Sequence, residues 1–562
     1  MTKTKYENYT REQLLVEVKK LSKRKKYGLV WEEEKTKEKF EADAEGKLPV
    51  LVEDKKREIK TDGTKPTHLL IEGDNYHALS VLNYTHAKSI DVIYIDPPYN
   101  TGAKDWKYNN DYVDAEDGYR HSKWLSFMSN RLKLAKKLLK PKGVLICTID
   151  ENEHATLGLL LNELFSDKEI VCVTIIHNPG GIQGNNFSYT HEYAYFVHPQ
   201  KGTFISKLKR DDIDPVPLRD WGKESSKRES AKNCFFPIFL KDEKVIGFGD
   251  VSPDNFHPKK ANIIRKDGVM EVYPIDKNGV ERKWRFSRQS IDEIKEELLC
   301  KKIKNEYVIV RDKRDYRWKT VWDDNKYNAN VYGTKLLNNI VDANFPFPKS
   351  LYAVIDCIRA VIHDKNDAKI LDFFAGSGTT GHAVLELNAE DGGNRQFILC
   401  TKNENNICHD VTYPRVEKVI KGYKAKNGEK ISGIGSNLKY YKTNFVGSEA
   451  THRNKKMLTE KSVEMLCIRE NTFEEVVSKP QIFIYKGKKK YTAILLNELK
   501  LEEFKKELAK LKLPVSVYVF SLESDDFKEE LEGLKNDITL CSIPEAILKV
   551  YRRIYETAKP QK

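Results

Sequence analysis

The residues with the clearest chemical potential are Asp96, Pro97, Pro98 and Tyr99, which directly follow the apolar run IDVIYI at 90–95. Two consecutive prolines hold a backbone rigid and extended. They would therefore fix a carboxylate, a backbone carbonyl and an aromatic ring around one small pocket. An exocyclic amine suits such a pocket, because the Asp96 side chain and the Pro97 carbonyl can accept its two N–H groups. A surface Asp-Pro turn with a chance tyrosine is the alternative interpretation.

A Gly-rich turn at 372–381 (DFFAGSGTTG) is the second motif, and it lies between an expected strand and an expected helix. Gly376 and Gly378 would let the backbone approach a ligand closely, because no Cβ intervenes. The turn also matches G-x-G-x-x-G, so a dinucleotide cofactor is one alternative and a plain tight turn is another. It lacks the Gly-Lys-Ser/Thr of a phosphate-binding Walker loop.

Short apolar runs alternate with helical patterns around both motifs. Strands are expected at 69–72, 90–95, 144–149, 369–374 and 396–401, and helices at about 120–140 and 152–165. This alternation predicts an α/β fold with a doubly wound, mostly parallel sheet. The turn would then lie at strand carboxyl ends, where such sheets bind ligands.

The alternation stops between about 180 and 345 and then resumes, which predicts one α/β domain split by an insert. Residues 201–340 hold 31 Lys or Arg and 23 Asp or Glu, so most of the net charge of +13 lies there. The expected domains are a helical N-terminal arm (1–60), a first α/β half (61–180), the insert (181–345), a second half (346–445) and a small C-terminal α/β domain (446–562).

The composition favours a cytoplasmic protein that does not enter a membrane. The nine cysteines form no Cys-x-x-Cys pair, and no zinc spacing is present, so we expect neither disulfides nor a metal. No apolar run approaches the length of a membrane span. The positive net charge is a modest indication of a polyanionic partner.

The Asp-Pro-Pro-Tyr motif and the Gly-rich turn together resemble those of amino-group DNA methyltransferases. The catalytic motif comes before the cofactor motif, with the basic insert between them, which resembles the β class of that family. The resemblance implies transfer of a methyl group from S-adenosylmethionine to adenine N6 in double-stranded DNA. The target base would be flipped out of the duplex, with Tyr99 stacking on it. Asp before Pro-Pro-Tyr favours adenine N6 over cytosine N4.

Further segments resemble the Mod subunit of Type III restriction-modification systems, namely 27–32 (YGLVWE), 96–102 (DPPYNTG) and 400–415 (CTKNENNICHDVTYPR). Residues 143–157 resemble the strand and helix that complete the family's catalytic half. The resemblance also implies which residues hold the cofactor: Asp74, Asp96, Lys349, Asp372, Phe374, Gly376, Ser377, Gly378, Thr379 and Glu404. Lys349 would lie near the carboxylate of the cofactor. The acidic residue for its ribose is displaced from the family position, with Glu404 as the candidate.

The insert would be the target recognition domain, with two basic and aromatic clusters. Its expected DNA contacts are Arg282, Trp284, Arg285, Arg288, Arg311, Arg314 and Arg317. For any single residue, a solvated face or a local core is an equal alternative.

The leading function is therefore the modification subunit of a Type III system, expected as a homodimer that can bind a separate restriction subunit. A solitary adenine methyltransferase and a DNA-recognition adaptor for a nuclease are alternatives. A dinucleotide-linked oxidoreductase is disfavoured by Asp-Pro-Pro-Tyr at the strand end.

Overall fold

A computed structural model describes residues 9–22, 29–32, 36, 38, 47–108, 111–183, 186–210, 214–303, 306–343, 345–362, 365–447, 449, 451–520, 527–531, 537–543 and 547–549. The chain forms two compact units. One comprises Met1–Ser206 and Lys319–Lys562, and the other is Lys207–Trp318.

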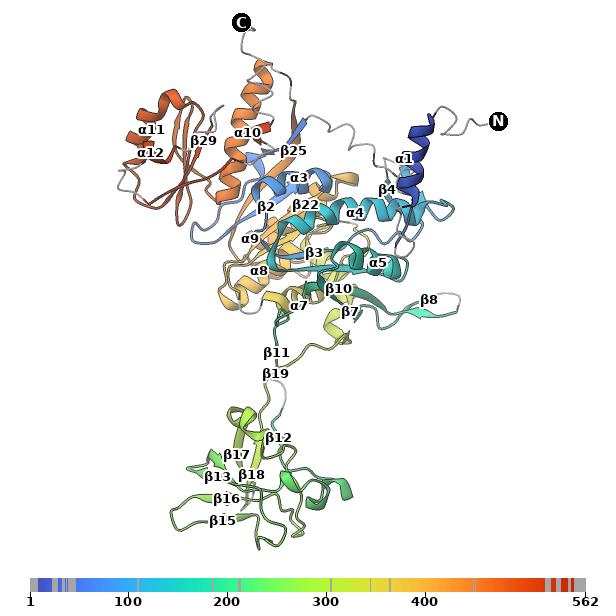
Figure 1. Ribbon diagram of the computed structural model, residues 1–562, viewed down its shortest axis with the longest axis vertical. Coiled ribbons are helices and arrows are strands. Elements are labelled where there is room, and N and C mark those ends of the chain that lie inside the picture. Colours follow the sequence, from blue (N-terminus) through green and yellow to red (C-terminus); the bar gives the residue numbers. More distant parts are fainter. Residues whose placement is uncertain are drawn as a thin grey trace. The chain divides into compact units, whose positions relative to one another are not determined.

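A ten-stranded sheet is the centre of the first unit (Figure 1). Its strands, in order across the sheet, are β1 (Lys47–Glu53), β25 (Asn437–Gly447), β2 (Thr67–Glu72), β22 (Gln396–Thr401), β21 (Lys369–Asp372), β3 (Ile90–Ile95), β6 (Leu139–Ile149), β10 (His191–Pro199), β7 (Lys168–Ile176) and β20 (Val321–Trp322). Most neighbours are parallel, whereas β1 runs antiparallel to β25 and β10 runs antiparallel to both β6 and β7. The predicted doubly wound α/β fold is confirmed.

Helices cover both faces of this sheet, which explains why all six residues of β3 are buried. One group packs side by side: α3 (Asn75–Thr85), α4 (Arg120–Leu138), α5 (His154–Leu164) and α10 (His452–Glu470). The other group is α7 (Leu351–Ile362), α8 (Thr379–Asp391) and α9 (Tyr413–Lys421). β21 pairs with β22 on one side and with β3 on the other. The order of strands diverges at this point, and a ligand crevice is expected there.

The ends of two predicted helical regions differ from expectation. α4 ends at Leu138, and Leu139 already begins β6, because the residues before Pro141 are forced toward an extended conformation. The interval 1–60 contains α1 (Arg11–Ser22), but Lys47–Glu53 is strand β1. Its apolar residues Leu48, Val50 and Leu51 are buried in the core under the sheet, so this part of the arm belongs to the α/β domain.

The second unit is a β-rich module with its own core. Its strands are β11 (Leu208–Lys209), β12 (Val216–Pro217), β13 (Ile238–Lys241), β14 (Lys244–Phe248), β15 (Asn262–Ile264), β16 (Met270–Val272), β17 (Leu298–Ile303), β18 (Glu306–Arg311) and β19 (Asp315–Tyr316). They form a four-stranded, a three-stranded and a two-stranded sheet. The unit covers fewer residues than the insert 181–345 that the sequence predicts. The strands on either side of it, β10 and β20, pair within the central sheet.

The C-terminal part of the chain has a separate five-stranded sheet and core. Its elements are β26 (Glu474–Lys479), β27 (Ile482–Lys486), β28 (Tyr491–Leu495), α11 (Leu501–Leu508), β29 (Val515–Val519), α12 (Lys528–Leu531) and β30 (Ile538–Leu540). Among the described residues, every helix is too short or too polar to cross a lipid bilayer.

Candidate active site

Asp96 follows β3 directly, and one of its carboxylate oxygens is held by the protein. Its Oδ1 accepts hydrogen bonds from Thr148 Oγ1 (2.7 Å) and from the Tyr99 hydroxyl (2.8 Å). The motif is anchored further by Trp124, whose Nε1 donates to the Pro98 carbonyl at 2.7 Å. Within the described part of the chain, neither Asp96 Oδ2 nor the Pro97 carbonyl has a hydrogen-bond partner. The motif therefore has two unpartnered acceptors, one on the anchored Asp96 carboxylate and one on the backbone next to it.

Lys349 lies at this motif. Its Nζ is 3.1 Å from Asp96 Oδ1, 2.5 Å from the Tyr99 hydroxyl and 2.9 Å from Glu192 Oε2. An ammonium has three donors, so these three acceptors satisfy it completely. The resemblance implies that Lys349 lies near the carboxylate of a cofactor, and its contacts among the described residues are with the Asp-Pro-Pro-Tyr motif and Glu192.

Glu192, in β10, is a site residue that the sequence did not reveal. It is only 3% exposed, and its Oε2 lies 3.0 Å from the Tyr99 hydroxyl, as an alternative acceptor for the single proton of that hydroxyl. The available signal was a carboxylate directly before the largely apolar run YAYFV (193–197), because such groups are rarely buried without a partner.

Charges in this cluster influence one another strongly. Burial lowers the pKa of Lys349, but Asp96 and Glu192 together raise that pKa above its usual value. Burial raises the pKa of Glu192, but Lys349 and His177 bring it below the normal range. Burial, reinforced by Asp96 and Glu192, raises the pKa of the Tyr99 hydroxyl. The cluster thus holds one ammonium between two carboxylates, with a net charge of −1.

The Gly-rich turn joins β21 to α8 next to this cluster, because β21 pairs with β3 in parallel. Gly376 and Gly378 have φ of 48° and 79°, a region that favours glycine. Asp372 accepts from the Phe374 amide (2.9 Å) and Thr380 Oγ1 (2.5 Å). Burial raises the pKa of Asp372 to about 7.

Ser377 and Thr379, expected to bind a cofactor, have their hydroxyl oxygens 3.1 Å apart and nearly buried. Arg415, in α9, donates to both oxygens, at 3.2 and 2.8 Å. Phe374 is half-buried, with its ring centroid 5.7 Å from that of Phe127. The turn is therefore contacted by two helices, by α9 through Arg415 and by α4 through Phe127.

A cavity of about 520 Å³ opens at the carboxyl ends of β2 and β22. It is lined by Gly73, Asp74, Lys402, Glu404 and Thr443, among others. The expected cofactor residues Asp74 and Glu404 are thus brought to one cavity. A Cβ on Gly73 would lie 2.0 Å from Thr443 Oγ1, so the wall requires glycine there.

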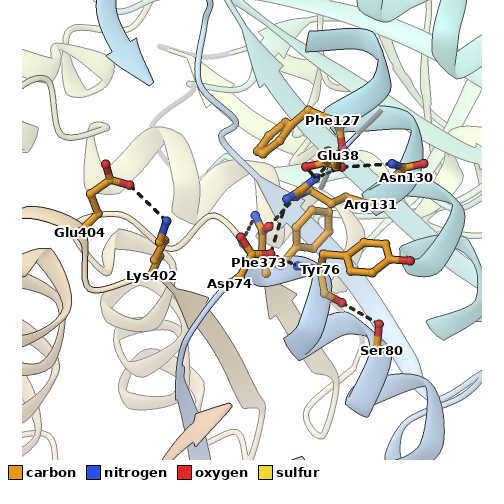
Figure 2. A network of polar contacts seen from close by, with 11 residues as sticks. Glu38, Asp74, Tyr76, Ser80, Phe127, Asn130, Arg131, Phe373, Lys402 and Glu404 are labelled. Carbon is orange, nitrogen blue, oxygen red and sulfur yellow. Dashed lines mark hydrogen bonds and ion pairs between the residues drawn. The ribbon is translucent and has the colours of Figure 1, made fainter. Parts of the chain in front are cut away.

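A polar network behind the cavity holds Asp74 (Figure 2). Asp74 Oδ1 accepts from the Tyr76 amide at 2.8 Å, and Arg131 Nη2 lies 3.5 Å away. Arg131 also donates to Glu38 and, at 2.5 Å, to Asn75 Oδ1. Asn75 Nδ2 in turn donates to the Phe373 carbonyl (3.1 Å), which links the cavity to the Gly-rich turn.

A family model described as "DNA methylase" matches residues 90–412, more than half of the chain. The chain belongs to the DNA methylase family. The matched range includes the Asp-Pro-Pro-Tyr motif, the Gly-rich turn and the region between them.

Two relatives of this methylase are 31% identical to it. One is the Mod subunit of the Type III restriction-modification enzyme EcoPI of Escherichia phage P1, with 63% of this chain and 60% of that protein covered. The other is the Type II methyltransferase M.KpnI of Klebsiella pneumoniae, with 66% and 87% covered. The chain thus spans about 60% of the length of the phage protein. A solved structure, the putative DNA modification methylase TTHA0409 of Thermus thermophilus, is 13% identical over 66% of this chain and 99% of that one, with a TM-score of 0.31.

The second unit of the methylase places the expected DNA contacts in unequal environments. Trp284 is 2% exposed, and its Nε1 donates to the Phe236 carbonyl at 2.8 Å. Its large apolar ring packs in the core of the unit, so it is a core residue and not an exposed contact.

The six arginines of that unit that were expected to contact DNA divide into two groups. Four have carboxylate partners at 2.5–2.8 Å: Arg282 with Asp276, Arg288 with Asp292, Arg311 with Glu297 and Arg314 with Asp312. Arg285 and Arg317 are exposed, and no side-chain partner is found for them among the described residues. These two are the best placed of the set to contact a polyanion.

Proposed function

We propose that this methylase transfers a methyl group from S-adenosylmethionine to adenine N6 of a base flipped out of double-stranded DNA. The observation that carries the proposal is the state of Asp96. One of its oxygens is anchored by Thr148 and Tyr99, while the other oxygen and the Pro97 carbonyl are free acceptors beside the Gly-rich turn. An exocyclic amine with two N–H groups matches these two acceptors.

The residues of the chain would act mainly by orientation and electrostatics. Adenine N6 is a weak nucleophile, so holding both N–H groups aims its lone pair at the methyl donor. As the N–C bond forms, the bond between the methyl group and sulfur would break, with its electron pair going to sulfur. Positive charge would develop on nitrogen until one N6 proton passes to solvent, with Asp96 as the neighbouring acceptor. The net charge of −1 on Asp96, Glu192 and Lys349 stabilises that developing charge.

The cavity and the turn fit S-adenosylmethionine. Asp74 and Glu404 provide carboxylates for hydroxyl and amino groups, and the Gly-rich turn permits close backbone approach. When bound, the cofactor would supply an electrophilic methyl group on a sulfonium centre. Asp372 and Phe374 would support the turn, and a metal is not required by this chemistry.

Among methylases, we assign this chain to the modification subunits of Type III systems, which is supported by the 31% identity to the EcoPI Mod subunit. It would then bind DNA through the second unit, form a homodimer and associate with a separate restriction subunit. The similarity to M.KpnI favours a solitary methyltransferase as the second candidate. Purification from cells that also produce a restriction subunit separates the two, because only the first candidate predicts a stable complex.

Methylation-sensitive sequencing of DNA treated with the pure protein tests the reaction. N6-methyladenine at a short defined site is the expected result. A modified cytosine, or no modification in the presence of S-adenosylmethionine, would refute the proposal. A calorimetric titration with S-adenosylmethionine and with NAD tests the cofactor independently.

A further inference from the structure

Arg415 is a buried cation without a carboxylate partner. Its side chain is 0% exposed, and no Asp or Glu among the described residues pairs with it. Its Nη1 donates to Thr379 Oγ1 (2.8 Å), Ser377 Oγ (3.2 Å) and the Ser377 carbonyl (3.4 Å). Its Nη2 lies 3.3 Å from His382 Nδ1, and its Nε has no partner. Burying an unpaired charge is costly, so a fold that retains one usually uses it.

Other buried arginines of this chain are neutralised. Arg131 faces Glu38, Arg395 faces Asp391, and Arg228 faces Glu281, each at 2.6–2.9 Å. Burial lowers the pKa of Arg415 to about 9, with only Tyr423 opposing the shift. Arg415 therefore contributes an uncompensated positive charge to its surroundings.

That charge lies under the first turn of α8. The N-cap residue of α8 is Gly378, which has no side chain to satisfy the free N–H groups of this turn. The positive end of the dipole of α8 and the charge of Arg415 both lie at the Gly-rich turn, and both favour binding of an anion there. Lys349, which was expected near the cofactor, is paired with Asp96 and Glu192.

We infer that Arg415 is the positioning residue that provides the counter-charge for the carboxylate of S-adenosylmethionine at the Gly-rich turn, acting through Ser377 and Thr379. This inference rests on the proposed function. Arg415 does not reach the surface, so it works through the two hydroxyls. Because their oxygens accept from the guanidinium, their protons point elsewhere. One proton can bridge the two oxygens, and the other is left to donate toward a ligand.

Decarboxylated S-adenosylmethionine provides the test, because it lacks only the carboxylate. Calorimetry should show that the wild-type protein binds S-adenosylmethionine on the order of 10-fold or more tightly than the decarboxylated form, as expected for one charge-assisted contact. Raising the ionic strength should change this ratio little, since a buried charge is weakly screened. Equal affinities in the wild type would overturn the inference without any variant. Failure to bind either compound would instead refute the proposed function.

Arg415→Met should abolish the preference by weakening S-adenosylmethionine alone, whereas Arg415→Lys should keep most of it. Arg395→Met is the matched control, because Arg395 is equally buried but paired with Asp391. It should lower the melting temperature and leave the ratio of affinities unchanged. If Arg415→Met weakens both compounds equally, its role is only structural. Should that variant not fold, Thr379→Val, which removes the nearest acceptor of Arg415, should also reduce the preference.

Discussion

Lys349 Nζ lies 2.9 Å from Glu192 Oε2, in a contact between a loop that precedes α7 and strand β10. Tyr99 and Asp96 contact the same ammonium. The Asp-Pro-Pro-Tyr motif therefore belongs to a four-residue polar cluster that comes from three distant parts of the chain. The properties of Asp96 depend on that cluster as well as on its own tetrapeptide.

Replacing Asp96 by alanine is expected to abolish methylation while leaving cofactor binding largely intact, because in the proposed reaction Asp96 would hold the acceptor amine. Asp96→Asn keeps the shape of the side chain and should also be inactive. A carboxylate has two acceptor oxygens, whereas an amide has only one, and its NH₂ group is a donor. Radiolabelled methyl transfer and calorimetry check the two parts. Turnover at the wild-type rate in either variant would contradict the assignment.

Glu192→Gln is expected to lower kcat by about 10- to 100-fold, the effect of losing one charge-assisted contact of roughly 1.5–3 kcal/mol. Asp96 would then be the only carboxylate that contacts Lys349. The full charge of the ammonium would act on Asp96 and make it a weaker acceptor for the amine. The KM for S-adenosylmethionine should change little, because Glu192 is not one of the residues that line the cavity. Glu169→Gln, an exposed glutamate in the adjacent strand β7, is the control and should match the wild type.

Stability should fall between pH 6 and pH 8 because of Asp372. Burial raises its folded-state pKa to about 7, above the usual value near 4, so the folded protein binds this proton more tightly than the unfolded chain. The resulting stabilisation is complete below about pH 4 and is lost as the pH rises through 7. The loss from pH 6 to pH 8 amounts to about 1.4 kcal/mol.

Urea denaturation at several pH values measures this effect, and Asp372→Asn should flatten it. Asp150, whose pKa burial raises to about 6, contributes in the same direction at lower pH, so some slope should remain in the variant. An unchanged slope in Asp372→Asn would show that Asp372 is ionised throughout.

Arg285→Ala and Arg317→Ala should each weaken DNA binding and reduce the slope of log K against log salt concentration by about 1, the value for one lost phosphate contact. Fluorescence anisotropy over a range of salt concentrations provides the measurement. Lys512→Ala, an exposed lysine of the C-terminal domain, should change neither quantity. Trp284→Ala should instead destabilise the second unit by about 3–5 kcal/mol through loss of a buried aromatic side chain.

The sequence by itself determined the fold class and the nature of the chemistry. Asp96, Pro97, Pro98 and Tyr99 could be placed at the end of a buried strand because strand, proline and turn preferences are local properties of a short segment. The order of the two motifs was equally visible, and both lie inside the range that the family model matches.

Only the tertiary structure decided which side chains meet. Glu192 and Lys349 reach Asp96 because β10 pairs beside β6 and because α7 follows Lys349, and neither arrangement is encoded near Asp96. Trp284 and Arg285 are neighbours with the same apparent character, yet one is core and the other is exposed. Arg415 lies under the Gly-rich turn through the packing of α9 on α8. Burial and ion pairing depend on contacts between residues far apart in sequence, so local patterns cannot determine them.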